Sequence, residues 1–197
     1  DLTAGVAELR SRIASEHPDL PVVLIGHSMG GLIAARTVLD VAPDYKTLIL
    51  TGPLLGVPTP PPAWQSWLLR TLSALFPAAK ALEIDASAVS RDQAVVDDYV
   101  ADPLVHHENI PARTVVSLFD EASAVLGRAS EISLPTLLLH GEKDELTSVP
   151  ASRQFMADLS ATDKHITVYP GMYHELFNEP EKEDIIRTCL DWIAARL

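Results

Sequence analysis

The sequence predicts an α/β fold in which helices cover both faces of a mostly parallel sheet. Short apolar runs with the β-branched content of buried strands alternate with longer segments whose apolar residues recur at helical spacing. One of these strands passes into a helix through the turn Gly26-His27-Ser28-Met29-Gly30, and another strand follows that helix. The order strand, helix, strand indicates a parallel βαβ unit.

The first part of the chain contains two predicted strands and two predicted helices. Leu2, Val6, Leu9 and Ile13 recur at helical spacing and predict a surface helix that ends near Pro18. The strands expected after it cover residues 21–25 and 47–51, and the helix between them runs to about residue 40.

The pattern changes after residue 53, where helical periodicities interrupted by proline replace the strand-like runs. We expect a helical insertion over residues 54–133 that lies on the core as a cap. Its predicted helices cover residues 64–76, 91–100 and 111–126.

Strands and helices alternate again from residue 134 to the end of the chain. We expect strands at 135–140 and 165–169, and helices at about 152–159 and 181–196. The predicted organisation is therefore an α/β core in two parts, 1–53 and 134–197, separated by the cap 54–133.

Composition and charge narrow the range of functions. The 197 residues are 47% hydrophobic, and 15 Lys and Arg stand against 27 Asp and Glu, for a net charge of −12. This charge disfavours nucleic acids and electrostatic attachment to anionic lipid. The only cysteine, Cys189, lies among apolar residues, so we expect a buried, unreactive thiol.

The turn at 26–30 has the pattern of a nucleophile elbow, which presents a catalytic serine. We expect Gly26 and Gly30 to be required because side chains at both positions would collide in the tight turn. The turn raises the Ser28 hydroxyl above the sheet at a helix N-terminus, whose N–H groups favour developing negative charge. We interpret His27 as structural, because a neighbour on the elbow points elsewhere.

A serine nucleophile needs a histidine base and an acid that orients this base. In α/β-hydrolases these residues follow the serine in the order acid, histidine, each in a loop after a parallel strand. Asp144 follows the strand at 135–140, and His174 follows the strand at 165–169. Carboxyl ends of parallel strands meet at one edge of the sheet, so Ser28, Asp144 and His174 are predicted to converge.

Other titratable residues are weaker candidates. Glu142 and Glu145 are close enough in sequence to compete with Asp144. His140 is expected in the core or in support of the site, His106 and His107 in the cap, and His17 and His165 near the surface. The stretch that begins at His174 resembles the start of a zinc-protease helix but has no second histidine, so we expect no metal and no cofactor.

Three motifs together resemble bacterial monoacylglycerol lipases, which belong to the serine aminopeptidase and lysophospholipase-like branch of the α/β-hydrolase fold. They are Gly-His-Ser-Met-Gly-Gly at 26–31, Asp-Pro-Leu-Val-His at 102–106, and Tyr-Pro-Gly-Met-Tyr-His-Glu-Leu-Phe-Asn-Glu-Pro-Glu at 169–181. The resemblance implies Ser28 as nucleophile, Asp144 as orienting acid, His174 as base and the Met29 backbone N–H as an oxyanion donor.

The resemblance also implies that the cap covers a tunnel for an acyl chain. The apolar stripe from Trp64 to Phe76 suits two roles, contact with a membrane or packing of the cap helix on the core. We expect a cytoplasmic protein whose cap makes transient membrane contact.

A complete family member has strands upstream of the first helix and a His-Gly loop that supplies a second oxyanion N–H. We expect this segment to be missing from the chain, which would leave the strand at 21–25 with an unpaired apolar edge. One lost oxyanion donor costs on the order of 3 kcal/mol in the transition state, so the isolated chain is expected to be weakly active or inactive.

The expected reaction is hydrolysis of monoacylglycerol esters through an acyl-enzyme. The alternatives are a general carboxylesterase, a lysophospholipase and, with less support, a ligand-binding protein of the same fold without catalytic activity. A dehalogenase or epoxide hydrolase would carry Asp at the elbow, where this chain has Ser28.

Overall fold

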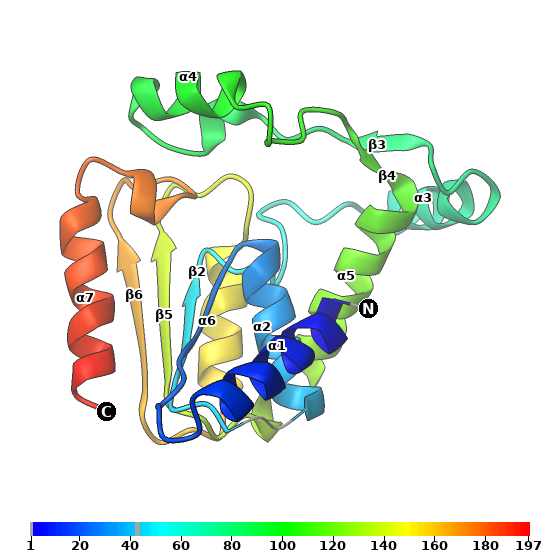
Figure 1. Ribbon diagram of the computed structural model, residues 1–197. Coiled ribbons are helices and arrows are strands. Elements are labelled where there is room, and N and C mark those ends of the chain that lie inside the picture. The colour runs from blue at the N-terminus through cyan, green and yellow to red at the C-terminus, as the bar shows by residue number, and fades with distance from the viewer. Residues whose placement is uncertain (1, 42–43) are drawn as a thin grey trace.

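The computed structural model describes residues 2–41 and 44–197, which form a parallel sheet with helices on both faces and a cap above it (Figure 1). The sheet order is β1-β2-β5-β6, and all neighbouring strands are parallel. These strands are β1 (Leu24–His27), β2 (Leu48–Thr51), β5 (Thr136–Gly141) and β6 (Lys164–Tyr169). The predicted fold class is confirmed.

The two central strands are buried on both faces, as their continuous apolar sequences predict. Every residue of β2 and β5 is buried. Helices α2 (Met29–Val41) and α6 (Val149–Asp158) pack on one face, and α7 (Lys182–Ala194) packs on the other. The remaining core helix, α1 (Leu2–Glu16), lies against α2 and has no buried residue, which agrees with a surface helix.

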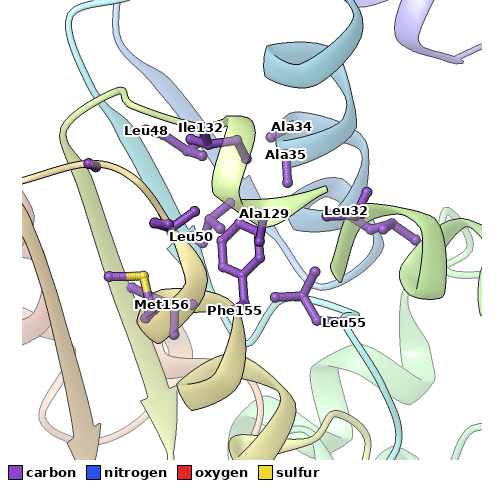
Figure 2. Close-up of a cluster of buried hydrophobic side chains, with 14 of the residues drawn as sticks. Leu32, Ala34, Ala35, Leu48, Leu50, Leu55, Ala129, Ile132, Phe155 and Met156 are labelled. Carbon is purple, nitrogen blue, oxygen red and sulfur yellow. The ribbon is translucent and has the colours of Figure 1, made fainter. Parts of the chain in front are cut away.

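The larger core cluster is centred on Phe155, which is fully buried (Figure 2). Around it lie Leu32 and Ala35 from α2 and Leu48 and Leu50 from β2. On the opposite face, Ile49, Leu137 and Leu139 pack with Ile185 and Cys189 of α7. Burial raises the pKa of the Cys189 thiol to about 11, so this cysteine is buried and protonated at neutral pH, as predicted.

The strand β1 begins later than the sequence predicts and forms one edge of the sheet. The expected range was 21–25, whereas the structure gives Leu24–His27. Pro21 has no N–H to donate, and pairing with the neighbouring strand segment begins at the Val22 carbonyl, which accepts from the Lys46 N–H at 2.8 Å. Within the described residues β1 pairs only with β2, and Ile25 is 49% exposed.

The cap contains the three predicted helices and two short strands that the sequence did not predict. Its helices are α3 (Ala63–Leu75), α4 (Gln93–Ala101) and α5 (Ala112–Gly127). Strands β3 (Lys80–Leu82) and β4 (Ile110–Pro111) pair antiparallel. The described chain also contains three short 3₁₀ helices, of which η1 (Ala86–Ala88) and η2 (Ala129–Glu131) lie in the cap region and η3 (Leu176–Asn178) lies after β6. Strands of two or three residues are too short to show an alternating pattern.

The cap lies above the carboxyl ends of the strands, where the loops that carry the predicted site residues begin (Figure 1). Helix α5 belongs to both layers: it packs on α3, where Arg70 donates to Asp120, and it places Ala122 and Val125 in the core cluster. The boundaries 1–53, 54–133 and 134–197 therefore remain a prediction. None of the described helices combines the length and the apolar character that a bilayer-spanning segment needs.

Candidate active site

The turn between β1 and α2 holds Ser28 in a backbone conformation that side chains rarely adopt. Its φ is +52°, and it is the only residue other than glycine in the described chain with a positive φ. The Ser28 N–H donates to the Thr51 carbonyl at 3.1 Å, and the Ser28 carbonyl accepts from the Leu54 N–H at 2.9 Å. Strand β2 and the loop after it therefore bind both the N–H and the carbonyl of the strained residue, as expected for an elbow that presents its side chain.

Glycines around Ser28 differ in what they contribute. A Cβ at Gly26 would lie 2.5 Å from the Gly30 carbonyl oxygen, and a Cβ at Gly31 would lie 2.8 Å from Pro53 Cβ. A Cβ at Gly30 would meet nothing within 4 Å, so the prediction that Gly30 avoids a collision is wrong. The Gly30 carbonyl crowds Gly26, whereas the Gly30 Cα faces open space.

Asp144 and His174 meet at the same edge of the sheet. The His174 Nδ1 lies 2.7 Å from Asp144 Oδ2, and both side chains are buried. His27, which precedes Ser28, lies with its ring centroid 4.7 Å from that of His174. The three predicted loops therefore converge. The Ser28 hydroxyl makes no hydrogen bond to His174 among the described residues, and such bonds often tighten only when substrate binds.

The carboxylate of Asp144 is surrounded by hydrogen-bond donors. Its Oδ1 accepts the N–H groups of Leu146 and Thr147, both at 2.8 Å. Its Oδ2 accepts the Thr147 hydroxyl at 2.7 Å and lies 3.1 Å from His140 Nε2. Burial alone raises the pKa of this carboxyl, but the bonds from His140 and His174 outweigh it and hold the pKa well below its ordinary value.

His140 is a second histidine on the same carboxylate, which agrees with its expected place in the core or in support of the site. It is fully buried, and its Nδ1 lies 3.0 Å from the Ser152 hydroxyl. If the serine donates to Nδ1, the proton of the neutral ring is on Nε2 and faces Asp144. His140 therefore lies in the core and contacts the Asp144 carboxylate from there.

Two glycines that the sequence analysis did not single out give the site its space. Gly52 has a φ of +47°, and a Cβ there would lie 3.1 Å from His174 Nδ1 and 3.3 Å from Asp144 Oδ2. A Cβ at Gly141 would lie 2.0 Å from the Tyr173 carbonyl oxygen. The sequence does place a glycine at the carboxyl end of each central strand, and this feature could have indicated that other chain segments approach closely there.

The competing candidates lie apart from the Asp144–His174 pair. Glu142 is exposed and accepts the Gly171 N–H, and Glu145 is exposed as well. In the cap, His107 packs its ring edge-on against Tyr99, and His106 is exposed. His17 and His165 are exposed, as expected. Among the described residues no group of three or more His, Cys, Asp and Glu side chains is placed to hold a metal ion.

His27 is held by the neighbouring strand. Its Nδ1 donates to the Thr51 carbonyl at 2.9 Å, which agrees with the structural role expected for this residue. Burial lowers the pKa of His27 below 6.5, and the nearby His174 lowers it further. Met29 is the first residue of α2, where N–H groups have no acceptor within the helix.

Comparisons with known proteins show the family of this chain. A family model described as serine aminopeptidase, S33, matches residues 1–181. The chain belongs to this family. It is 36% identical over 200 residues to a monoacylglycerol lipase of Mycolicibacterium smegmatis, a match that covers 100% of this chain and 71% of the relative. The family predicted from the three motifs is confirmed.

Two further relatives support the same branch. A human monoglyceride lipase is 30% identical over 184 residues, which cover 92% of this chain and 61% of that protein. The crystal structure of a Paleococcus ferrophilus monoacylglycerol lipase superposes with a TM-score of 0.83 and 30% identity, and covers 98% of this chain and 76% of that chain. The chain thus spans less than two thirds of the human relative and more than two thirds of the two microbial ones.

Gly52→Ala is expected to slow the reaction of Ser28 with a fluorophosphonate by about 10-fold to 100-fold, because the new methyl group displaces the His174 ring. The rate is measured by gel-based labelling of the intact protein. Gly127→Ala is the matched control, since a Cβ there meets nothing within 4 Å and its φ is not positive. Equal labelling rates in both variants would show that Gly52 is not needed for the site.

His27→Asn is expected to flatten the pH dependence of thermal stability between pH 7 and 5. The pKa of His27 is lowered in the folded state, so the unfolded chain binds more protons. Its contribution to stability is complete above pH 6.5 and is lost as the pH falls below that value. Asparagine can still donate to the Thr51 carbonyl. Melting temperatures that decline equally steeply in both proteins contradict this account.

Proposed function

We propose that the protein hydrolyses the ester bond of monoacylglycerols to glycerol and fatty acid through an acyl-enzyme, with Ser28 as nucleophile, His174 as base and Asp144 as the acid that orients it. The observation that carries this proposal is the buried Asp144–His174 hydrogen bond beside a strained serine elbow. The names of the relatives support the substrate class.

Each step assigns a proton to a named atom. Because the His174 Nδ1–H donates to Asp144, the His174 Nε2 is free to accept the Ser28 proton while the Ser28 oxygen attacks the ester carbonyl. The Met29 N–H stabilises the oxyanion. His174 then gives its proton to the departing glycerol oxygen. In the second half, His174 takes a proton from water, the hydroxide attacks the acyl carbon, and the proton returns to Ser28 as the fatty acid leaves.

An apolar pocket between cap and core supports a substrate with a long hydrocarbon chain. Its volume is about 410 Å³, within the range of small-molecule sites. The walls include Val57 after β2, Leu69 of α3, and Val116 and Phe119 of α5. Ser28, Asp144 and His174 do not line this pocket. We therefore propose that the acyl chain is bound to the enzyme at Ser28 and extends from there, beneath the cap, into the pocket. The net charge of −12 favours a neutral monoglyceride over an anionic phospholipid.

Ser28→Ala is expected to abolish fluorophosphonate labelling and to lower monoacylglycerol hydrolysis by at least about 1,000-fold in the intact protein. Labelled peptide mass and fatty-acid release are the readouts. Parent protein that labels at Ser28 but prefers short esters or lysophospholipid is a carboxylesterase or lysophospholipase. A parent that labels nowhere indicates the ligand-binding alternative.

The open edge of β1 supports the expectation that upstream strands complete the sheet. Ile25 is 49% exposed, whereas the residues of β2 and β5 are all buried. We propose that such strands pair with β1 and that a loop among them supplies the second oxyanion donor. The labelling experiment therefore compares this chain with and without its upstream segment, and labelling that is equally fast in both forms contradicts the proposal.

The outer face of α3 is the part of the cap that we propose to contact membranes. Trp64, Trp67, Leu68, Leu75 and Phe76 are exposed, while Ser73 is buried on the side toward α5. This exposure supports membrane contact over the alternative that the stripe packs on the core. Exposed indole rings on a helix suit the interface between lipid headgroups and acyl chains. With a cytoplasmic location, this contact would bring the site to its lipid substrate.

Two of the three tryptophans lie on α3, so the intrinsic fluorescence is expected to shift to shorter wavelength when phosphatidylcholine vesicles are added. The double variant Trp64→Ser/Trp67→Ser is expected to sediment with vesicles several-fold less than the parent. Leu190→Ser, which changes an exposed apolar residue on α7, is the control. Unchanged fluorescence and sedimentation of the parent contradict membrane contact by α3.

A further inference from the structure

The backbone near His174 is linked to the cap, directly at Glu175 and through Glu179 at Tyr173. The Glu175 N–H donates to the Val89 carbonyl at 2.8 Å. The Tyr173 N–H donates to Glu179 Oε1 at 2.9 Å, and the same oxygen accepts the Arg91 N–H at 3.2 Å. Residues 89–91 connect η1 to α4, so this segment of the cap binds the peptide that follows His174 directly and, through Glu179, the Tyr173 N–H before it.

The Glu179 carboxylate links the two layers by charge as well. Its side chain is fully buried, and Oε2 accepts the Arg91 Nε at 2.6 Å. Arg91 also pairs with Glu181, and the Ser90 hydroxyl donates to the Asn178 carbonyl at 2.9 Å. The hydrogen bond to Glu179 raises the pKa of Arg91 above its ordinary value. We refer to residues 89–91 and the Glu179 carboxylate as the clasp.

The clasp is rigid on both sides. Val89 and Ser90 are buried at 1% and 2% exposure, so the cap segment that carries them is packed rather than a free surface loop. Asp92 accepts the Ala94 N–H at 3.0 Å and caps α4, which fixes the start of this helix directly after Arg91. A buried carboxylate that lost Arg91 would be an uncompensated charge, so the Tyr173 N–H and the loop around it would have to rearrange.

We propose that Arg91 and Glu179 are positioning residues for His174, and that the cap therefore contributes to the chemical step itself, even with esters too small to reach the acyl pocket. This inference rests on the proposed function. It assigns a role to the Ser-Arg-Asp sequence at 90–92 and to the Asn-Glu-Pro-Glu sequence at 178–181, which lie far apart in the chain and do not contact the reacting atoms.

Arg91→Met is expected to lower kcat for p-nitrophenyl acetate about 10-fold to 100-fold with little change in KM, since the base is displaced while the binding of this small ester is not. Arg91→Lys retains a cation for Glu179 and is expected to recover part of the loss. Glu179→Gln is expected to lower kcat as well, and the double variant Arg91→Met/Glu179→Gln to lose less than the product of the two single effects.

Arg128→Met is the matched control. Arg128 also pairs with two carboxylates, Asp40 and Glu131, and its side chain is 36% exposed against 31% for Arg91, but it lies at the end of α5. Wild-type kcat in Arg91→Met, or an equal loss in Arg128→Met, overturns the proposal.

Hydrogen exchange of the Tyr173 and Glu175 amides separates this inference from the proposed function. These N–H groups are expected to exchange at least about 10-fold faster in Arg91→Met than in Arg128→Met, because their acceptors are released. This measurement needs no turnover, so it decides for or against the clasp even if the intact protein hydrolyses no ester. Equal exchange in the two variants overturns the clasp.

Discussion

The site depends on a single buried carboxylate that is surrounded by donors. Asp144 can stay ionised away from water because two backbone N–H groups, one hydroxyl and two imidazoles face it. Those donors come from its own loop, from the end of β5 and from the loop after β6. The Thr147 hydroxyl also lies 3.1 Å from the Gly52 carbonyl, so the loop after β2 joins the same group.

This arrangement places strict demands on the backbone around it. Three loops can meet at one carboxylate only if their chains approach more closely than side chains allow, and Gly52 and Gly141 provide that approach. The elbow adds a third constraint, because Gly26 packs against the Gly30 carbonyl and Gly31 packs against Pro53. Glycines therefore provide the space at the strand ends, and the few larger side chains around them provide the candidate chemistry.

The sequence predicts where the candidate site lies because its residues keep a fixed relation to the strands. Ser28, Asp144 and His174 each follow a recognisable apolar strand, and the parallel order of those strands brings their ends together. The helical periodicity of the apolar residues also predicts the three cap helices. By contrast, the pairing of Arg91 with Glu179 joins residues 88 positions apart and has no periodic signature.

The other features that the sequence did not predict correctly also depend on contacts between distant residues. The prediction that a side chain at Gly30 would collide is wrong because a sequence motif does not show which of its glycines lies against other atoms. Only the packing shows that a Cβ at Gly26 would contact the neighbouring backbone. The stripe on α3 predicted a helix with one apolar face, but the direction of that face depends on which side α5 covers. Strands β3 and β4 hold only three and two residues and depend on each other across the cap.

Helix α5 links the folding of the two layers. At its start, the Ala112 and Arg113 N–H groups donate to the carbonyls of Ala79 and Pro77 in the cap. Near its end, Val125 is fully buried in the core cluster. Because one continuous helix serves both layers, unfolding of α5 would remove apolar contacts from the core and release the cap backbone at Ala79 and Pro77 together. Helix α5 therefore couples the local stability of this part of the cap to that of the core.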